Sequence, residues 1–125
     1  MIRKLIMGAL VTAITLSGWV ASSVFANEEW QWPTVYTMSN ETDGNAVLAF
    51  RQHGDTLVPA GSFPTGGKGS GGGLGNQGAL AFSNDGDALL VVNPGSHDIS
   101  VFEINGRHLK LVDRVPSGGT SPISI

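Results

Sequence analysis

The glycine-rich stretch from residue 66 to residue 78 is the part of the sequence closest to a nucleotide-binding motif. Eight of its thirteen residues are glycine, and both 67–72 and 73–78 fit the spacing G-x-G-x-x-G. A dinucleotide site needs a helix directly after these glycines, because the helix N-terminus holds the pyrophosphate. Only four apolar residues follow before a turn cluster at 83–87, which leaves no room for a helix. Since Gly69 follows Lys68 where a P-loop requires serine or threonine, we interpret the stretch as a flexible connection between strands.

Titratable side chains are few and stand in or beside turns. His53, His97 and His108 show neither of the spacings His-x-His and His-x-x-x-His that place two imidazoles on one metal ion. Asp85 and Asp87 flank a glycine, which is typical of a turn stabilised by its own carboxylates. We therefore predict no metal and no cofactor, and the catalytic residues, if any, stay unknown.

The composition excludes several classes of site and partner. The 125 residues contain no cysteine, which rules out a disulfide scaffold and any cysteine-ligated metal. Seven basic residues stand against ten acidic ones, which gives a net charge of −3 and argues against a nucleic-acid binder. Sixteen of the 18 glycines follow residue 26, so that part of the chain is expected to be rich in turns.

The first 26 residues have the pattern of a signal peptide. Arg3 and Lys4 precede an apolar run from Leu5 to Leu16, and small residues at Val24 and Ala26 suit cleavage after position 26. The alternative is an uncleaved membrane anchor, because no charged residue occurs from residue 5 to residue 27. Export without cysteine favours a bacterial periplasmic or secreted protein, whose mature part is residues 27–125.

The mature part is an internal repeat with a period of 52 residues. Shifting 44–67 by 52 places this segment on 96–119 without a gap. A fixed period of this length is typical of stacked or radial units. The matching positions are Phe50 and Phe102, Gly54 and Gly106, Leu57 and Leu109, 64–67 and 116–119, and, after a one-residue gap, Asn40 and Asn93.

Each round of the repeat is predicted to form short antiparallel strands separated by turn signals, among them Asn105-Gly106. Four such strands make a propeller blade, so we predict an all-β protein of four-stranded antiparallel β-propeller blades. The chain holds about two blades of an incomplete propeller, and we expect an N-terminal fragment of a longer protein or a truncated gene product. The predicted strands are 34–38, 46–50 and 57–63, then 79–82, 88–92, 99–104 and 109 to about 116, and the first strand of a third unit at 122–125.

Several segments resemble the opening blades of the lactonase-family seven-bladed β-propellers. The family includes 6-phosphogluconolactonase-like proteins, carboxymuconate cyclase-like sequences and many exported members without an assigned reaction. The resemblance covers about residues 34–125 and implies a ligand site at a central channel. The family's proposed catalytic positions lie largely in blades that this chain lacks, so no catalytic residue is carried over. The segments are Val35–Asn40, Gly44–Val47, Pro64–Gly67, Gly72–Leu80, Asn93–Phe102 and Val115–Pro122.

Five residues are candidates for ligand binding at that channel. Asn76 and Gln77 directly precede the innermost strand of the second blade, where a connection between blades ends at the channel mouth. Thr120 and Ser121 occupy the same place in the next round, and Lys68 could attract an anionic ligand.

Together these features predict the N-terminal portion of an exported lactonase-like β-propeller. The complete protein would be a lactone hydrolase acting on a lactone or a sugar-derived molecule, and this chain alone would be inactive. One alternative is a non-catalytic propeller of the cell envelope that binds a ligand or a partner, and another is a truncated remnant without activity. The expected partners are a small-molecule ligand and the missing blades of the same protein, without nucleic acid and, after signal cleavage, without a membrane.

Overall fold

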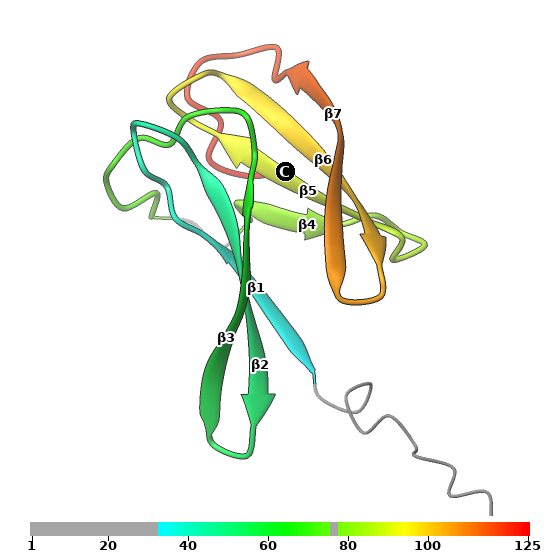
Figure 1. Ribbon diagram of the computed structural model, residues 1–125. Helices are drawn as coiled ribbons and strands as arrows, with labels where there is room; N and C mark the ends of the chain where they lie inside the picture. Colours follow the sequence, from blue (N-terminus) through cyan, green and yellow to red (C-terminus); the bar gives the residue numbers. More distant parts are fainter. Residues whose placement is uncertain (1–32, 76–77) are drawn as a thin grey trace, which may run out of the picture.

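The computed structural model describes residues 33–75 and 78–125, and this part of the chain is all-β. Seven strands form two antiparallel sheets, with the orders β1-β2-β3 and β4-β5-β6-β7 (Figure 1). Each strand therefore pairs with its neighbour in the chain, as in the predicted blades. The bounds are β1 Thr34–Met38, β2 Ala46–His53, β3 Thr56–Pro64, β4 Leu80–Phe82, β5 Ala88–Asn93, β6 Asp98–Asn105 and β7 His108–Pro116.

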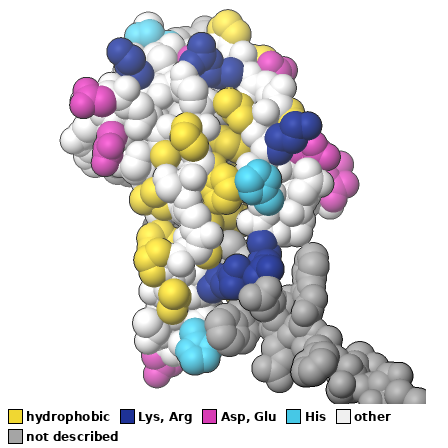
Figure 2. Space-filling model, in the orientation of Figure 1, with side chains coloured by type: hydrophobic (Ala, Val, Ile, Leu, Met, Phe, Trp, Pro, Cys, Tyr) yellow, Lys and Arg dark blue, Asp and Glu magenta, His cyan; other side chains and the backbone are white. Residues whose placement is uncertain are grey.

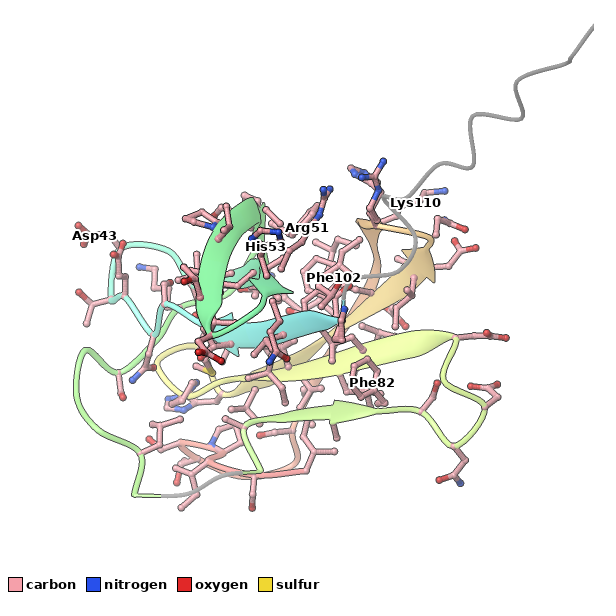
Figure 3. All side chains as sticks on the ribbon, turned by 90° about the horizontal axis from the view of Figure 1, so that it is seen from below. Asp43, Arg51, His53, Phe82, Phe102 and Lys110 are labelled. Atoms are coloured by element: carbon pink, nitrogen blue, oxygen red, sulfur yellow. The ribbon has the colours of Figure 1, made fainter. Side chains whose placement is uncertain are left out.

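The hydrophobic core lies between the two sheets. Val47 of the first sheet forms one buried cluster with Leu89, Val91 and Phe102 of the second. Figure 3 shows Phe102 in the space between the sheets, and only 1% of its surface is exposed. Side chains alternate between the two faces of a strand, so one face of each sheet supplies the core and the other face points away from it.

The 52-residue repeat extends to the irregularities of the sheets. Strands β2 and β3 recur as β6 and β7, each 52 residues later and with the same length. The pairing shifts after Ala49 in the first sheet and after Val101 in the second, so Ala60 and Val112 are the extra residues of two equivalent bulges. The predicted repeat and its strands are confirmed, including the irregular position of Val112.

The two outer hairpins use the same turn. Gly54 and Gly106 open their two-residue loops with φ angles of 58° and 60°, a backbone conformation that glycine adopts without steric cost. Glycine at the first central position is typical of a type II′ turn, which matches the right-handed twist of the strands. The predicted hairpin at Asn105-Gly106 is therefore present.

Two details of the predicted repeat are wrong. The backbone N–H of Ser39 donates to the carbonyl of Ala46, and Asn93 pairs with Asp98, so Ser39 rather than Asn40 is the counterpart of Asn93. The connection after β1 is thus two residues longer than the connection after β5.

The second wrong detail is the strand expected at 122–125. No described strand pairs with Pro122–Ile125, and a strand needs a partner for its backbone groups. The segment instead makes one backbone hydrogen bond, from the N–H of Ile125 to the carbonyl of Gly78.

Apolar side chains also reach the surface. Figure 2 shows them as a band down one side of the molecule, with charged side chains at its margins. The outer strands β3 and β7 contribute exposed apolar residues, namely Leu57, Val58, Leu111, Val112 and Val115.

The predicted signal peptide, residues 1–26, lies outside the described residues. Within 33–75 and 78–125, no helix is long and apolar enough to cross a membrane. The first sheet has three strands where the second has four, which agrees with the expectation that the innermost strand has no counterpart directly before Thr34.

Candidate functional site

Four polar side chains are buried together at the loop end of the two sheets. Asn45 and Thr65 come from the first sheet's loops, and Asn93 and Ser100 come from β5 and β6; each is at most 2% exposed. Buried polar atoms are costly unless they are hydrogen-bonded. No buried side-chain nitrogen or oxygen among the described residues lacks a partner, so this cluster is fully satisfied.

Asn93 is the centre of this cluster. Its Oδ1 accepts hydrogen bonds from the Thr65 hydroxyl at 2.7 Å and from the Asn45 amide at 2.9 Å. Its Nδ2 donates to Asp98 Oδ1 at 2.7 Å and to Ser100 Oγ at 2.8 Å. One amide therefore joins the two sheets and also fixes the turn between β5 and β6. We call Asn45, Thr65 and Asn93 the closed junction.

The glycine-rich connection packs on this junction. A Cβ atom built on Gly67 would lie 2.4 Å from Asn93 Cγ, and one built on Gly95 would lie 2.2 Å from the carbonyl oxygen of Gly69. The N–H of Gly95 also donates to the carbonyl of Lys68. Glycine is required here because the two backbones touch. The interpretation of residues 66–71 as a flexible connection is therefore wrong.

A small pocket of about 220 Å³ lies beside the turn between β5 and β6. Its charged residues are His97, Asp98 and Arg114, and the Arg114 Nε lies 3.6 Å from Asp98 Oδ2. Arg114 also donates to the carbonyl of Gly66. The carboxylate is thus held by Arg114 and Asn93, which makes it a fastening of the loops rather than a free base.

His97 is the remaining titratable group of this pocket. Its Nδ1 accepts a hydrogen bond from the backbone N–H of Ser121 at 2.9 Å. The Ser117 hydroxyl donates to the carbonyl of His97, not to its imidazole, so no serine is paired with a base here. His97 has a φ of 62°, which is uncommon for a residue other than glycine.

A larger groove of about 450 Å³ runs between β1 and the second half of the glycine-rich connection. Asn40 closes one end, because its Nδ2 donates to the Gly72 carbonyl at 2.6 Å and its Oδ1 accepts from the Ser70 N–H. Burial raises the pKa of the Tyr36 phenol above its usual value, so this group stays neutral in the groove. The lining residues are Tyr36, Thr37, Met38, Asn40, Gly72, Gly73, Leu74, Ala79 and Leu80.

The structure brings together some of the sequence-predicted ligand residues. The N–H of Lys68 donates to Ser96 Oγ, and the N–H of Ser121 donates to His97, so both residues adjoin the 220 Å³ pocket. The side chain of Lys68 is exposed, as is Thr120. Asn76 and Gln77 lie outside the described residues.

Sequence reasoning missed the closed junction. Asn93 stands before Pro94 and Gly95 and was read only as the end of an apolar strand. A polar residue directly after two valines is an available signal, because an unpaired amide is rare beside a buried strand.

Two further features limit the chemistry that these residues can perform. Within 33–75 and 78–125, no three His, Cys, Asp or Glu side chains are grouped as metal ligands. The pKa of Asp85 is lowered, first by the Ser83 hydroxyl at 2.5 Å and then by the N–H of Asp87, so this carboxylate stabilises its own turn.

No protein-family model matches the sequence, and neither a curated protein nor a solved structure gives a match. The assignment of function therefore depends on the chain's own residues.

Proposed function

We propose that this chain is a pair of propeller-type blades from an exported, lactonase-like protein. Its role is to hold further sheets of the same repeat in place around a ligand site. In this proposal the hydrolytic groups belong to other blades, and this chain alone does not open lactones.

The repetition of the two sheets carries the proposal. The bulges after Ala49 and Val101 recur after 52 residues, and so do the turn glycines Gly54 and Gly106. The two sheets also stack in the same sense, one face of the first against the opposite face of the second. A unit that repeats with one fixed contact suits radial assembly.

The polar groups of the described residues support a scaffold rather than a hydrolase. Lactone opening needs a base to activate water and donors for the developing oxyanion. Asp98 is held by Arg114 and Asn93, and the imidazole of His97 accepts a backbone N–H. These groups are occupied in fixing loops.

A lactone assay tests this proposal. The chain without residues 1–26 is mixed with glucono-δ-lactone or 6-phosphogluconolactone, and acid release is followed with a pH indicator. We expect the spontaneous rate and no more. Acceleration that is lost in His97→Gln and kept in the matched control His53→Gln would refute the scaffold role. N-terminal sequencing of the exported protein checks the predicted cleavage after Ala26.

The groove beside β1 favours a second candidate, a non-catalytic binding propeller of the cell envelope. It combines apolar walls with the polar groups of Tyr36, Thr37 and Asn40, a mixture common in small-molecule sites. Gluconate and glucono-δ-lactone can be titrated into the chain while the Tyr36 ring signals are followed by NMR. Leu74→Trp should fill the groove and abolish the shifts, and Leu57→Trp on the exposed outer strand should leave them unchanged. Shifts that survive Leu74→Trp would exclude the groove as the site.

A further inference from the structure

The free face of the second sheet corresponds, residue by residue, to a face of the first sheet that is covered. Tyr36, Met38, Val47 and Phe63 line the covered face, and they pack on the second sheet. Their counterparts are Leu90, Val92, Ile99 and Val115, which share one face because each lies across from another in the ladder.

The exposure of equivalent residues differs between these faces. Val47 and Ala49 are 0% and 3% exposed, whereas Ile99 and Val101 are half-buried. Val115 is 40% exposed. The free face is thus as apolar as the covered one, although no sheet lies against it within the described chain. Apolar surface of this kind marks an interaction site.

The hydrogen bonds of the closed junction also recur without their centre. Thr65 donates from its N–H and its hydroxyl to the Asn45 carbonyl, and Ser117 does the same to the His97 carbonyl. The N–H of Gly67 donates to Thr65 Oγ1, and that of Gly119 donates to Ser117 Oγ. We call His97, Ser117 and Gly119 the open junction.

The closed junction has Asn93 in a space that is empty at the open one. A Cβ on Gly67 would collide with Asn93, while one on Gly119 would meet nothing within 4 Å. Ser117 is half-buried and His97 is exposed, against complete burial of Thr65. The open junction therefore has the backbone, the hydroxyl and the room for an amide side chain, but no amide.

We propose that the free face and the open junction together dock another four-stranded sheet of this repeat, whose second strand ends in an asparagine at the position of Asn93. The inference rests on the proposed repeat architecture and names the partner's recognition residue. The Ser117 hydroxyl would donate to the partner's amide oxygen as Thr65 does to Asn93.

The first sheet of a second copy fits this site less well. Its residues at the positions of Asn93, Asp98 and Ser100 are Ser39, Ala46 and Leu48, which cannot reproduce the polar contacts. An aliphatic pair would also leave the partner groups of the open junction unpaired, which is unfavourable once they are buried. A sheet like the second one is the better occupant.

A three-repeat chain tests this proposal. Residues 68–119 are duplicated in tandem within the full chain, so that Gly119 is followed by a second Lys68, as Gly67 is by the first. We expect the added sheet to fold on the free face and to raise the midpoint of thermal unfolding. The N–H of Gly119 should exchange with solvent at least ~10-fold more slowly than in the natural chain, because it becomes buried.

Matched variants locate the contact. Gly119→Ala in the first copy should be neutral in the natural chain and should lower the midpoint in the three-repeat chain. Asn93→Ala in the added copy should have the same effect, with a roughly 5- to 30-fold smaller ratio of folded to unfolded protein. The double change His97→Asn and Ser117→Thr, which copies the closed junction, should raise the midpoint further.

Three results would overturn the proposal. The first is an added repeat that stays unfolded while the first two sheets keep their transition. The second is an added repeat that folds while Gly119→Ala and the added Asn93→Ala stay neutral. The third is self-association of the natural chain that Val101→Glu abolishes, since the occupant would then be a second copy. The lactone assay is independent of all these readouts, so failure of docking and failure of the proposed function are distinguishable.

Discussion

The closed and open junctions are the same piece of backbone in two surroundings. In the first, Asn93 from the neighbouring sheet enters between Asn45 and Thr65, and all three side chains are buried. In the second, His97 and Ser117 keep the backbone arrangement without a neighbour. The difference shows that the loop conformation is set by local hydrogen bonds, whereas the burial of its side chains depends on the adjoining sheet.

The largest expected effect concerns the phenylalanine that the repeat places in both sheets. Phe102 is buried by the first sheet, and its counterpart Phe50 is half-buried. Phe102→Ala should lower the free energy of unfolding by about 3–5 kcal/mol. Phe50→Ala should cost about 1–2 kcal/mol, because less apolar surface is lost from the core. Urea titrations followed by circular dichroism measure both, and equal losses would contradict the assigned faces.

The next largest effect is expected at the centre of the closed junction. Asn93→Ala removes the partner of the Thr65 hydroxyl and of the Asn45 amide and should cost about 2–3 kcal/mol. Asn84→Ala, in an exposed turn, is the matched control and should change stability by less than about 0.5 kcal/mol. If the two variants unfold at the same urea concentration, the junction does not hold the sheets together.

A glycine pair sharpens the comparison in the natural chain. Gly67→Ala must displace Asn93 and should cost about 1–3 kcal/mol. Gly119→Ala meets open space and should stay within about 0.5 kcal/mol of the natural protein. Thermal unfolding compares them directly, and a stable Gly67→Ala protein would show that the connection moves away from Asn93.

The smallest effect is expected at the turn between β4 and β5. The Ser83 hydroxyl lowers the pKa of Asp85, so ionised Asp85 adds stability above its unfolded pKa, and this is lost as the pH falls through the folded pKa. Ser83→Ala should raise the pKa of Asp85 toward its ordinary value and flatten the acid limb of the stability profile. NMR titration of the carboxyl carbon measures the change, and Ser117→Ala, far along the chain, should leave it unaltered.

The strands were predictable from the sequence because turn residues bound each of them. Asn105-Gly106 fixes one hairpin, and the spacing of Gly54 repeats it 52 residues earlier. The bulges also left a trace, since Val112 falls out of alternation where β7 carries its extra residue. Local rules of this kind are visible in a single sequence.

The closed junction was not predictable in the same way. It joins Asn45, Thr65 and Asn93, which lie up to 48 residues apart, and no local pattern indicates that they meet. The close backbone contacts of Gly67 and Gly95 were equally hidden, because glycine in a loop has the same appearance whether it is packed or free. The strand expected at 122–125 failed because local apolar character cannot supply a pairing partner.

The two bulges constrain how the chain can change in length over evolution. A strand that loses one residue turns every later side chain to the opposite face, so deletion of Ala60 or Val112 would bring polar groups into the core. Insertions are compatible with the sheets only in the connections, as the two extra residues after β1 illustrate. Growth by duplication must therefore proceed in whole units that each carry their own bulge, and recombination within a strand would yield a chain unable to pair.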